Sequence, residues 1–200
     1  STVAYLCGSI TIRDDDSLPP PVAYSVGSSY PSDLSPAGLE LSSVIEGAAT
    51  FSQARPAHVG VGDVVVCDDG SAMVIRRRLS DTAVLLDNLD GSAPFDNADL
   101  QVTAIRRAFA TLADALTGAG DQDHLGSYDL PAMGRRLEIA CYADGVDSTP
   151  VVVGSEWTTD EAHRIRIFTP ALPSEAAESQ RHSGTWDEGA YRLEVTDFPC

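Results

Sequence analysis

Short apolar runs divided by turn residues dominate the first half of the chain. Runs rich in valine, isoleucine and leucine predict strands, and the glycine, aspartate and asparagine between them favour tight turns. The expected strands are 39–41 with 44–45, 48–51, 64–67, 73–76 and 82–86. The expected turns are 46–47, 68–71 and 88–91. Strands at such short spacing predict a small β-barrel or sandwich, which we assign to residues 22–100.

One segment has the period of a helix. Apolar residues recur three and four apart over residues 102–116, and Gly118 and Gly120 follow as stop signals. The apolar positions are Val102, Ile105, Phe109, Leu112 and Leu116. The chain is therefore expected to be mainly β with one clear α-helix, whose apolar face packs on the core.

Strand patterns continue after the helix and also precede the barrel. Later strands are expected at 137–141, 151–153, 165–168 and 191–195, separated by longer turns. The start of the chain predicts a strand that ends at 9–12, and the prolines at 19–21 then favour a stiff, extended segment. This segment is either a plain linker or an arm that reaches a neighbour. The pattern thus predicts three parts, 1–21, 22–100 and 101–200.

The charge of the chain is strongly negative. Thirty acidic residues stand against 13 basic ones, a net charge of −17, and every basic residue is an arginine. Such a surface repels nucleic-acid phosphates and anionic lipids, so neither nucleic acid nor a membrane is an expected partner. The carboxylates serve solubility or, in a sharper interpretation, recruit divalent ions.

The four cysteines fall into two pairs by context. Cys67 and Cys141 lie in apolar runs and are expected to be buried, inert thiols. Cys7 and Cys200 lie near the two ends of the sequence and are candidates for a disulfide with each other or a link to a neighbouring subunit. Neither a C-x-x-C motif nor a Cys/His cluster at zinc spacing occurs, so no metal site is expected.

Sequence signatures of catalysis are missing. The segment Gly154-Ser155-Glu156-Trp157 lacks the second glycine of a nucleophile elbow, and a chain without lysine has no P-loop. Gly60-Val61-Gly62 lacks the third glycine of a dinucleotide-binding turn, and the region 88–91 lacks the ligands of a calcium loop. We therefore expect a protein that is not an enzyme and that holds no cofactor.

A few titratable side chains keep a catalytic alternative open. His163 lies near Asp160 and Glu161 in the sequence and is able to serve in acid–base chemistry. Three carboxylates would do so if two of them faced one cleft at glycosidase separation. These are Asp144, Asp147 and Glu156.

Several short segments carry a family resemblance. They are Tyr24-Ser25-Val26-Gly27, Ala49-Thr50-Phe51-Ser52, Val59-Gly60-Val61-Gly62-Asp63-Val64, Ile105-Arg106-Arg107-Ala108-Phe109, Cys141-Tyr142-Ala143-Asp144, Trp157-Thr158-Thr159-Asp160, Ile165-Arg166-Ile167-Phe168-Thr169-Pro170 and Ser179-Gln180-Arg181-His182-Ser183-Gly184-Thr185-Trp186-Asp187. Together they resemble a module of phage and environmental bacterial surface and virion structural proteins, over about residues 23–197. The resemblance implies a β domain, a capping helix and the first rungs of a right-handed parallel β-helix.

The same resemblance singles out a structural motif near the end of the chain. Its residues are Trp157, Arg181, His182, Gly184, Trp186 and Asp187. The two tryptophans are expected as packed anchors whose indole N–H reaches a backbone carbonyl, and the arginine as a fork for carbonyls or for Asp187. The glycine permits an unusual turn. Sugar binding by exposed aromatic rings is the alternative.

A structural part in a virus particle is the function that these observations favour. The expected protein is a capsid decoration or cement protein, or a head–tail or tail component, located in the virion. It would act through contacts with other copies of itself and with major capsid or tail proteins. The alternatives are a glycan-binding adhesion module, extracellular or on a cell surface, and a shortened β-helix enzyme that cleaves glycans.

Overall fold

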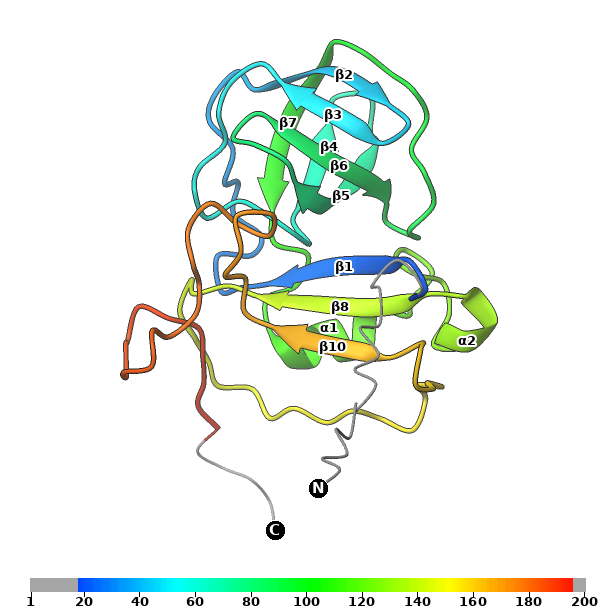
Figure 1. The fold of residues 1–200 in the computed structure, drawn as a ribbon, viewed down its shortest axis with the longest axis vertical. Helices are drawn as coiled ribbons and strands as arrows, with labels where there is room; N and C mark the ends of the chain where they lie inside the picture. Colours follow the sequence, from blue (N-terminus) through cyan, green and yellow to red (C-terminus); the bar gives the residue numbers. More distant parts are fainter. Residues whose placement is uncertain (1–17, 196–200) are drawn as a thin grey trace, which may run out of the picture.

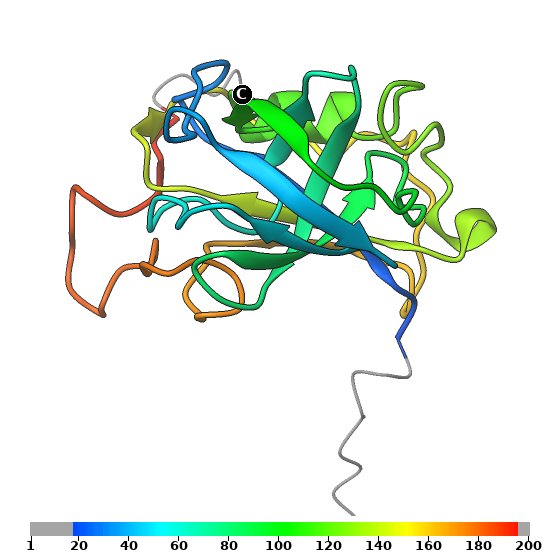
Figure 2. The same ribbon diagram turned by 90° about the horizontal axis from the view of Figure 1, so that it is seen from above.

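The computed structural model describes residues 18–195, which form a mainly β fold with two layers (Figure 1). A closed β-barrel lies on one side, and a three-stranded parallel sheet with two short helices lies on the other. Viewed from above, the barrel strands cross over the strands of the parallel sheet (Figure 2). The mainly β class and the small barrel are therefore confirmed.

The barrel consists of six antiparallel strands within the described residues. In chain order they are β2 (Glu40–Ile45), β3 (Ala48–Phe51), β4 (Val64–Cys67), β5 (Ala72–Arg78), β6 (Ala83–Asn88) and β7 (Leu100–Arg106). Their spatial order is β2-β3-β6-β5-β4-β7, and pairing of β2 with β7 closes the ring. Alternate side chains point inward, and those of Leu41, Val65, Ile75, Leu86 and Ile105 fill the barrel completely buried.

Local turn chemistry explains why these strands pair as neighbours. Glu46 and Gly47 join β2 to β3 with φ angles of 50° and 79°, the two positive values that a tight hairpin turn requires. Gly70, with φ of 86°, closes the turn between β4 and β5. Gly91, with φ of 79°, follows β6. Turns were expected at all three places, and the structure has them.

The parallel sheet gathers segments from both sides of the barrel in the sequence. It contains β1 (Pro21–Val26), β8 (Arg136–Cys141) and β10 (Ile165–Phe168), in the order β1-β8-β10. A second parallel pair joins β9 (Val146–Asp147) to β11 (Arg192–Leu193). One isolated parallel bridge joins Asp129 to Thr158. Segment 129–147 therefore pairs with segment 158–193 at three places, and these places follow one another in the same order along both segments.

Two short helices lie beside this sheet. Helix α1 (Leu112–Gly118) begins after Thr111, whose side chain accepts a hydrogen bond from the N–H of Asp114. Helix α2 (Leu130–Met133) ends at Gly134 in a left-handed conformation. Apolar residues of both helices pack against the sheet in one cluster with Tyr24, Leu137, Ile139 and Trp157.

The helix expected at 102–116 is wrong in its position. Residues 100–106 form β7, and the helix spans only 112–118. Ile105 is completely buried in the barrel, and Phe109 forms an isolated parallel β-bridge with Val26 of β1. The spacing of three and four thus arises from two elements that meet end to end, and pairing with distant strands overrides the local pattern.

The expected boundaries also differ from the sheet membership. Strand β1 lies in the region assigned to the barrel but pairs with β8, and β7 extends the barrel past residue 100. Within residues 18–195 the run 151–153 has no ladder partner, and of 191–195 only Arg192–Leu193 forms a strand. The run 151–153 looks apolar in sequence, but it crosses between paired segments. The strand expected at 9–12 lies outside the described residues.

Candidate functional site

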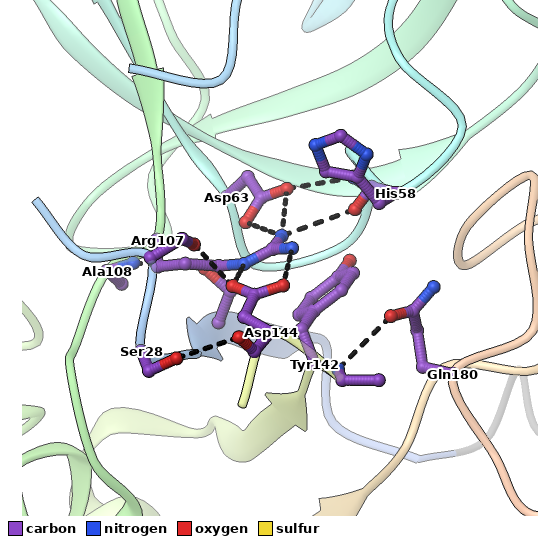
Figure 3. Close-up of polar contacts among 12 residues, drawn as sticks. Ser28, His58, Asp63, Arg107, Ala108, Tyr142, Asp144 and Gln180 are labelled. Carbon is purple, nitrogen blue, oxygen red and sulfur yellow. Dashed lines mark hydrogen bonds and ion pairs between the residues drawn. The ribbon is translucent and has the colours of Figure 1, made fainter. Parts of the chain in front are cut away.

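A buried ion cluster joins the barrel to the parallel sheet (Figure 3). Asp63 directly precedes β4, Arg107 directly follows β7, and Asp144 follows β8. Each residue therefore lies at or near the terminus of a strand. Because the strands are fixed by their ladders, the three charges meet with little freedom of position.

Arg107 is the centre of the cluster. Its side chain is 0% exposed, and Nη1 donates to both carboxylate oxygens of Asp63 at 2.8 Å. Nε and Nη2 donate to the two oxygens of Asp144 at 2.7 and 2.8 Å. The guanidinium also lies 3.6 Å from the centre of the Tyr142 ring, a cation–π contact. Carboxylates thus occupy two edges of the guanidinium, and an aromatic ring covers one face.

The loops around the cluster hold the two carboxylates in place. The N–H of Gly60 donates to Asp63 at 2.9 Å, and the hydroxyl of Ser29 donates to Asp144. Tyr142 donates its hydroxyl proton to the carbonyl of Val61 at 2.9 Å. A Cβ atom at Gly62 would overlap the backbone of β1, and its φ of 87° also favours glycine. The Val-Gly-Asp segment is therefore shaped to bring the barrel against β1.

Burial and ion pairing set the protonation of the cluster. Burial raises the pKa of Asp63, and Arg107 opposes that shift. Burial also acts to raise the pKa of Asp144, but its hydrogen bonds with Arg107 prevail and the pKa is lowered. Burial acts to lower the pKa of Arg107, and the two aspartates raise it above its usual range. Arg107 is thus held charged, and each of its three guanidinium nitrogens donates to a protein group.

Two hollows adjoin this junction, and they separate the carboxylates that a glycosidase would need together. Asp147 lies in a hollow of about 200 Å³ and accepts from the N–H of Leu112 at 2.7 Å. Asp144 lines a different hollow of about 370 Å³. Glu156 is exposed and lines neither hollow. The structure therefore does not bring these three carboxylates to one cleft.

His163 does meet its expected neighbour. Its Nδ1 lies 2.9 Å from Oδ1 of Asp160, and the backbone N–H of His163 donates to the same oxygen at 2.7 Å. The hydrogen bonds lower the pKa of Asp160. This pair lies in the turn before β10, where it closes the turn.

The structure divides the motif expected near the end of the chain. Trp157 is 8% exposed, and its Nε1 donates to the carbonyl of Leu116 at 2.8 Å, which fits a packed anchor. Trp186 is 70% exposed and stacks on His182, whose Nδ1 accepts from the N–H of Asp187 at 3.1 Å. Trp186 is therefore no core anchor, because it belongs to none of the three apolar clusters of the described residues.

The remaining motif residues belong to the same loop. Gly184 has φ of 100°, the conformation for which glycine was expected. Arg181 is exposed, and no ion pair between it and Asp187 is found among the described residues. Asp187 instead accepts from the N–H of Gly189 at 2.8 Å. The loop is held by bonds between its own side chains and backbone, and the guanidinium of Arg192 lies 5.8 Å from the centre of the Trp186 ring.

Cys67 and Cys141 are buried free thiols, as the sequence predicts. Burial raises the pKa of Cys141 to about 12, and the pKa of Cys67 is also raised. Cys7 and Cys200 lie outside the described residues. Within 18–195 no three histidine, cysteine or acidic side chains are grouped to hold a metal ion, and no helix there has the length and apolarity to cross a bilayer.

Sequence reasoning did not find the Arg107 cluster. Its partners lie 44 and 37 residues away along the chain, and no local pattern links them. One signal was present: each of the three charged residues follows or precedes an apolar strand run within a segment that carries the family resemblance. A charge at the end of a buried strand is a candidate for burial with a partner.

Comparison of the chain with protein-family models, curated proteins and solved structures gives no match.

Proposed function

We propose that the protein is a structural component of a phage or virus particle, either a capsid decoration protein or a head–tail or tail protein. The observation that carries this proposal is the parallel pairing of segment 158–193 with segment 129–147. Residues 129, 137 and 146 pair in parallel with 158, 165 and 192. Repetition of strands in this manner builds a rigid scaffold without requiring a ligand.

The three pairings support a finer proposal, that residues 129–193 form the first coils of a parallel β-helix. In such a fold each coil places an apolar residue over the corresponding residue of the coil before it. Tyr24, Ile139 and Ile167 occupy one such column, because Ile139 is the register partner of both others. The barrel covers the β1 side of this stack, where the N–H of Ser25 donates to Gly62 at 2.9 Å.

The ion cluster supports a structural role for the most unusual charged residues. Arg107, Asp63 and Asp144 engage one another, and a buried arginine with two carboxylates fixes the orientation of the barrel on the sheet. Removal of one member would leave a buried charge without compensation. We therefore propose that the protein is not an enzyme and that its distinctive residues hold the backbone in place.

The proposal is tested on native particles. Particles from a lysate of the host that carries the gene are separated on a density gradient, and the chain is located by mass spectrometry and immunogold labelling. We expect it in the particle fraction, with label at regular positions on the head or the tail. Recovery of the chain only as a soluble monomer outside the particle fraction would refute a virion role.

The same particles test the proposed link through Cys7 and Cys200. Non-reducing electrophoresis is expected to show bands at multiples of the monomer mass, which collapse on reduction. Bands at monomer mass alone, in the absence of reductant, would rule out a covalent link between subunits. An intramolecular bridge would then be sought by peptide mapping.

A second candidate function is glycan binding, and the exposed indole of Trp186 favours it. The His182 ring lies 5.5 Å from the indole at 27°, so the loop holds a flat aromatic surface in solvent. Titration of the protein with a panel of polysaccharides tests this by tryptophan fluorescence, with Trp186→Ala as the variant and Trp157→Phe as the control. Release of reducing ends from the same panel would instead favour the glycan-cleaving alternative.

A further inference from the structure

The last strand of the parallel sheet is open on one side. In parallel strands the N–H and C=O of one residue point the same way and those of the next residue point the opposite way. The N–H of Leu137 donates to the carbonyl of Arg164, so the polar groups of Arg164, Arg166 and Phe168 face β8. The N–H and C=O of Ile165 and Ile167 therefore face the free edge, where no strand of residues 18–195 lies.

At this edge an apolar side chain, that of Ile167, is also exposed to solvent. Ile139 and Ile167 are register partners, so their side chains lie on the same face of the sheet, the face on which Ile139 packs with residues of α1. Ile139 is 0% exposed because strands flank it on both sides, whereas Ile167 is 44% exposed. An edge strand that ended the sheet in water would favour a charged residue at this position. The isoleucine instead continues the apolar column begun by Tyr24.

On the other face of β10, the side chain of Arg166 indicates the charge of the partner. Arg166 lies beside its register partner Glu138, with Nη1 3.3 Å from the carboxylate, and its Nη2 lies 3.6 Å from Glu175. The Arg166 side chain is still 44% exposed. Cross-strand pairs of opposite charge stabilise a sheet, so an acidic residue is the favoured neighbour on the free side.

We propose that β10 is a docking edge for an extended segment of a partner protein that alternates apolar and acidic residues. The segment adds a strand to the sheet, its backbone bonds to Ile165 and Ile167, and its apolar side chains complete the column over Ile167. This inference rests on the proposed structural role and names the chemistry of the subunit contact.

A second copy of the chain fits this edge poorly. Two β10 strands related by a two-fold axis would run antiparallel and bring Arg166 of one copy near Arg166 of the other, which is unfavourable. The partner segment is therefore assigned to a different polypeptide.

The test uses an acetylated, fluorescein-labelled peptide with the sequence of residues 137–144 and Cys141→Ser. This peptide has the required alternation, Leu-Glu-Ile, at its start. Fluorescence anisotropy is measured on the full-length protein, on Ile167→Asp and on the control Ile45→Asp, an isoleucine on the barrel that is 60% exposed, against 44% for Ile167. We expect Ile167→Asp to weaken binding about tenfold or more, and Ile45→Asp to leave it unchanged. A peptide with Glu138→Arg is expected to bind about threefold to fivefold more weakly.

Hydrogen exchange adds a readout that depends on the backbone alone. In the free protein the amides of Ile165 and Ile167 should exchange fast, while those of Arg166 and Phe168 should be protected by β8. Peptide binding should protect Ile165 and Ile167. No binding, or equal weakening by both substitutions, would overturn the docking edge. A dimer in sedimentation analysis that Ile167→Asp dissolves would assign the edge to a second copy and also overturn it.

The two proposals fail separately. Absence of peptide binding, with the chain still present in particles, refutes the docking edge and leaves the virion role. Peptide binding by a chain that never enters particles refutes the virion role and leaves the edge. Thermal melting of Ile167→Asp confirms that any loss of binding is measured on folded protein.

Discussion

Replacement of Arg107 by methionine removes the centre of the ion cluster while it preserves much of the side-chain volume. Asp63 would then remain with 0% exposure and without its counter-charge. Breaking a buried ion pair in this way costs about 3–5 kcal/mol, a large share of the roughly 5–15 kcal/mol that stabilises a typical domain. We expect Arg107→Met to lower the free energy of unfolding by an amount in this range at neutral pH. Urea denaturation followed by circular dichroism measures it.

The pH dependence of this loss identifies its cause. Burial raises the folded-state pKa of Asp63, so the ionised form is the unfavourable one and stability is lost as the pH rises through that pKa. Without Arg107 the pKa of Asp63 rises further. As the pH is lowered, Asp63 is therefore protonated at a higher pH in the variant than in the wild type, and the cost of its buried charge disappears. The lowered pKa of Asp144 stabilises the wild type above the ordinary aspartate pKa of about 3.9, and that contribution disappears as the pH falls. The difference between variant and wild type should therefore narrow as the pH is lowered from about 7 toward about 4.

Two further variants complete this test. Arg77 is exposed on the barrel, so Arg77→Met is a matched control that should change stability by no more than about 0.5 kcal/mol. Asp63→Asn added to Arg107→Met removes the uncompensated charge and should restore at least about 1 kcal/mol. A loss below about 1 kcal/mol for Arg107→Met, or a loss that does not change with pH, would refute a structural ion cluster.

Three further outcomes follow from burial and backbone geometry. Trp157→Ala should lower stability by about 3–5 kcal/mol, whereas Trp186→Ala should change it by about 0.5 kcal/mol or less, as measured by urea denaturation. Gly62→Ala should lower the thermal midpoint markedly, because φ is 87° and a Cβ would meet the backbone of β1; an unchanged midpoint would contradict the close approach. In a protein with serine at the two other cysteine positions, Cys67 and Cys141 should react with a thiol reagent only after denaturant is added, and fast reaction of the native protein would show that they are accessible.

The barrel could be predicted because its signals are local. The Glu46-Gly47 turn and the turn at Gly70 each join strands that are neighbours both in sequence and in space. Hydrophobic alternation and turn residues therefore contain the needed information. The buried cysteines were predictable for a similar reason, because each lies within a continuous apolar run.

The helix and the ion cluster could not be predicted in this way. Residues 102–116 have helical spacing, but β7 is fixed by ladders with β2 and β4, and those contacts are remote in sequence. Arg107 meets two carboxylates that come from other parts of the chain, and the local pattern does not identify these partners. Strand β1 likewise pairs with β8, although all six barrel strands lie between them in the sequence. Long-range pairing decides each of these features, and it leaves no period in the sequence.

The most direct measurement is a cryo-electron microscopy reconstruction of the native particle at side-chain resolution. We expect ordered copies of the chain in regular contact with other subunits, with Arg107 enclosed by Asp63 and Asp144 and with no ligand between them. A particle that lacks the chain, or density for a substrate-like molecule bound among these three side chains, would contradict the proposal that they serve to hold the backbone.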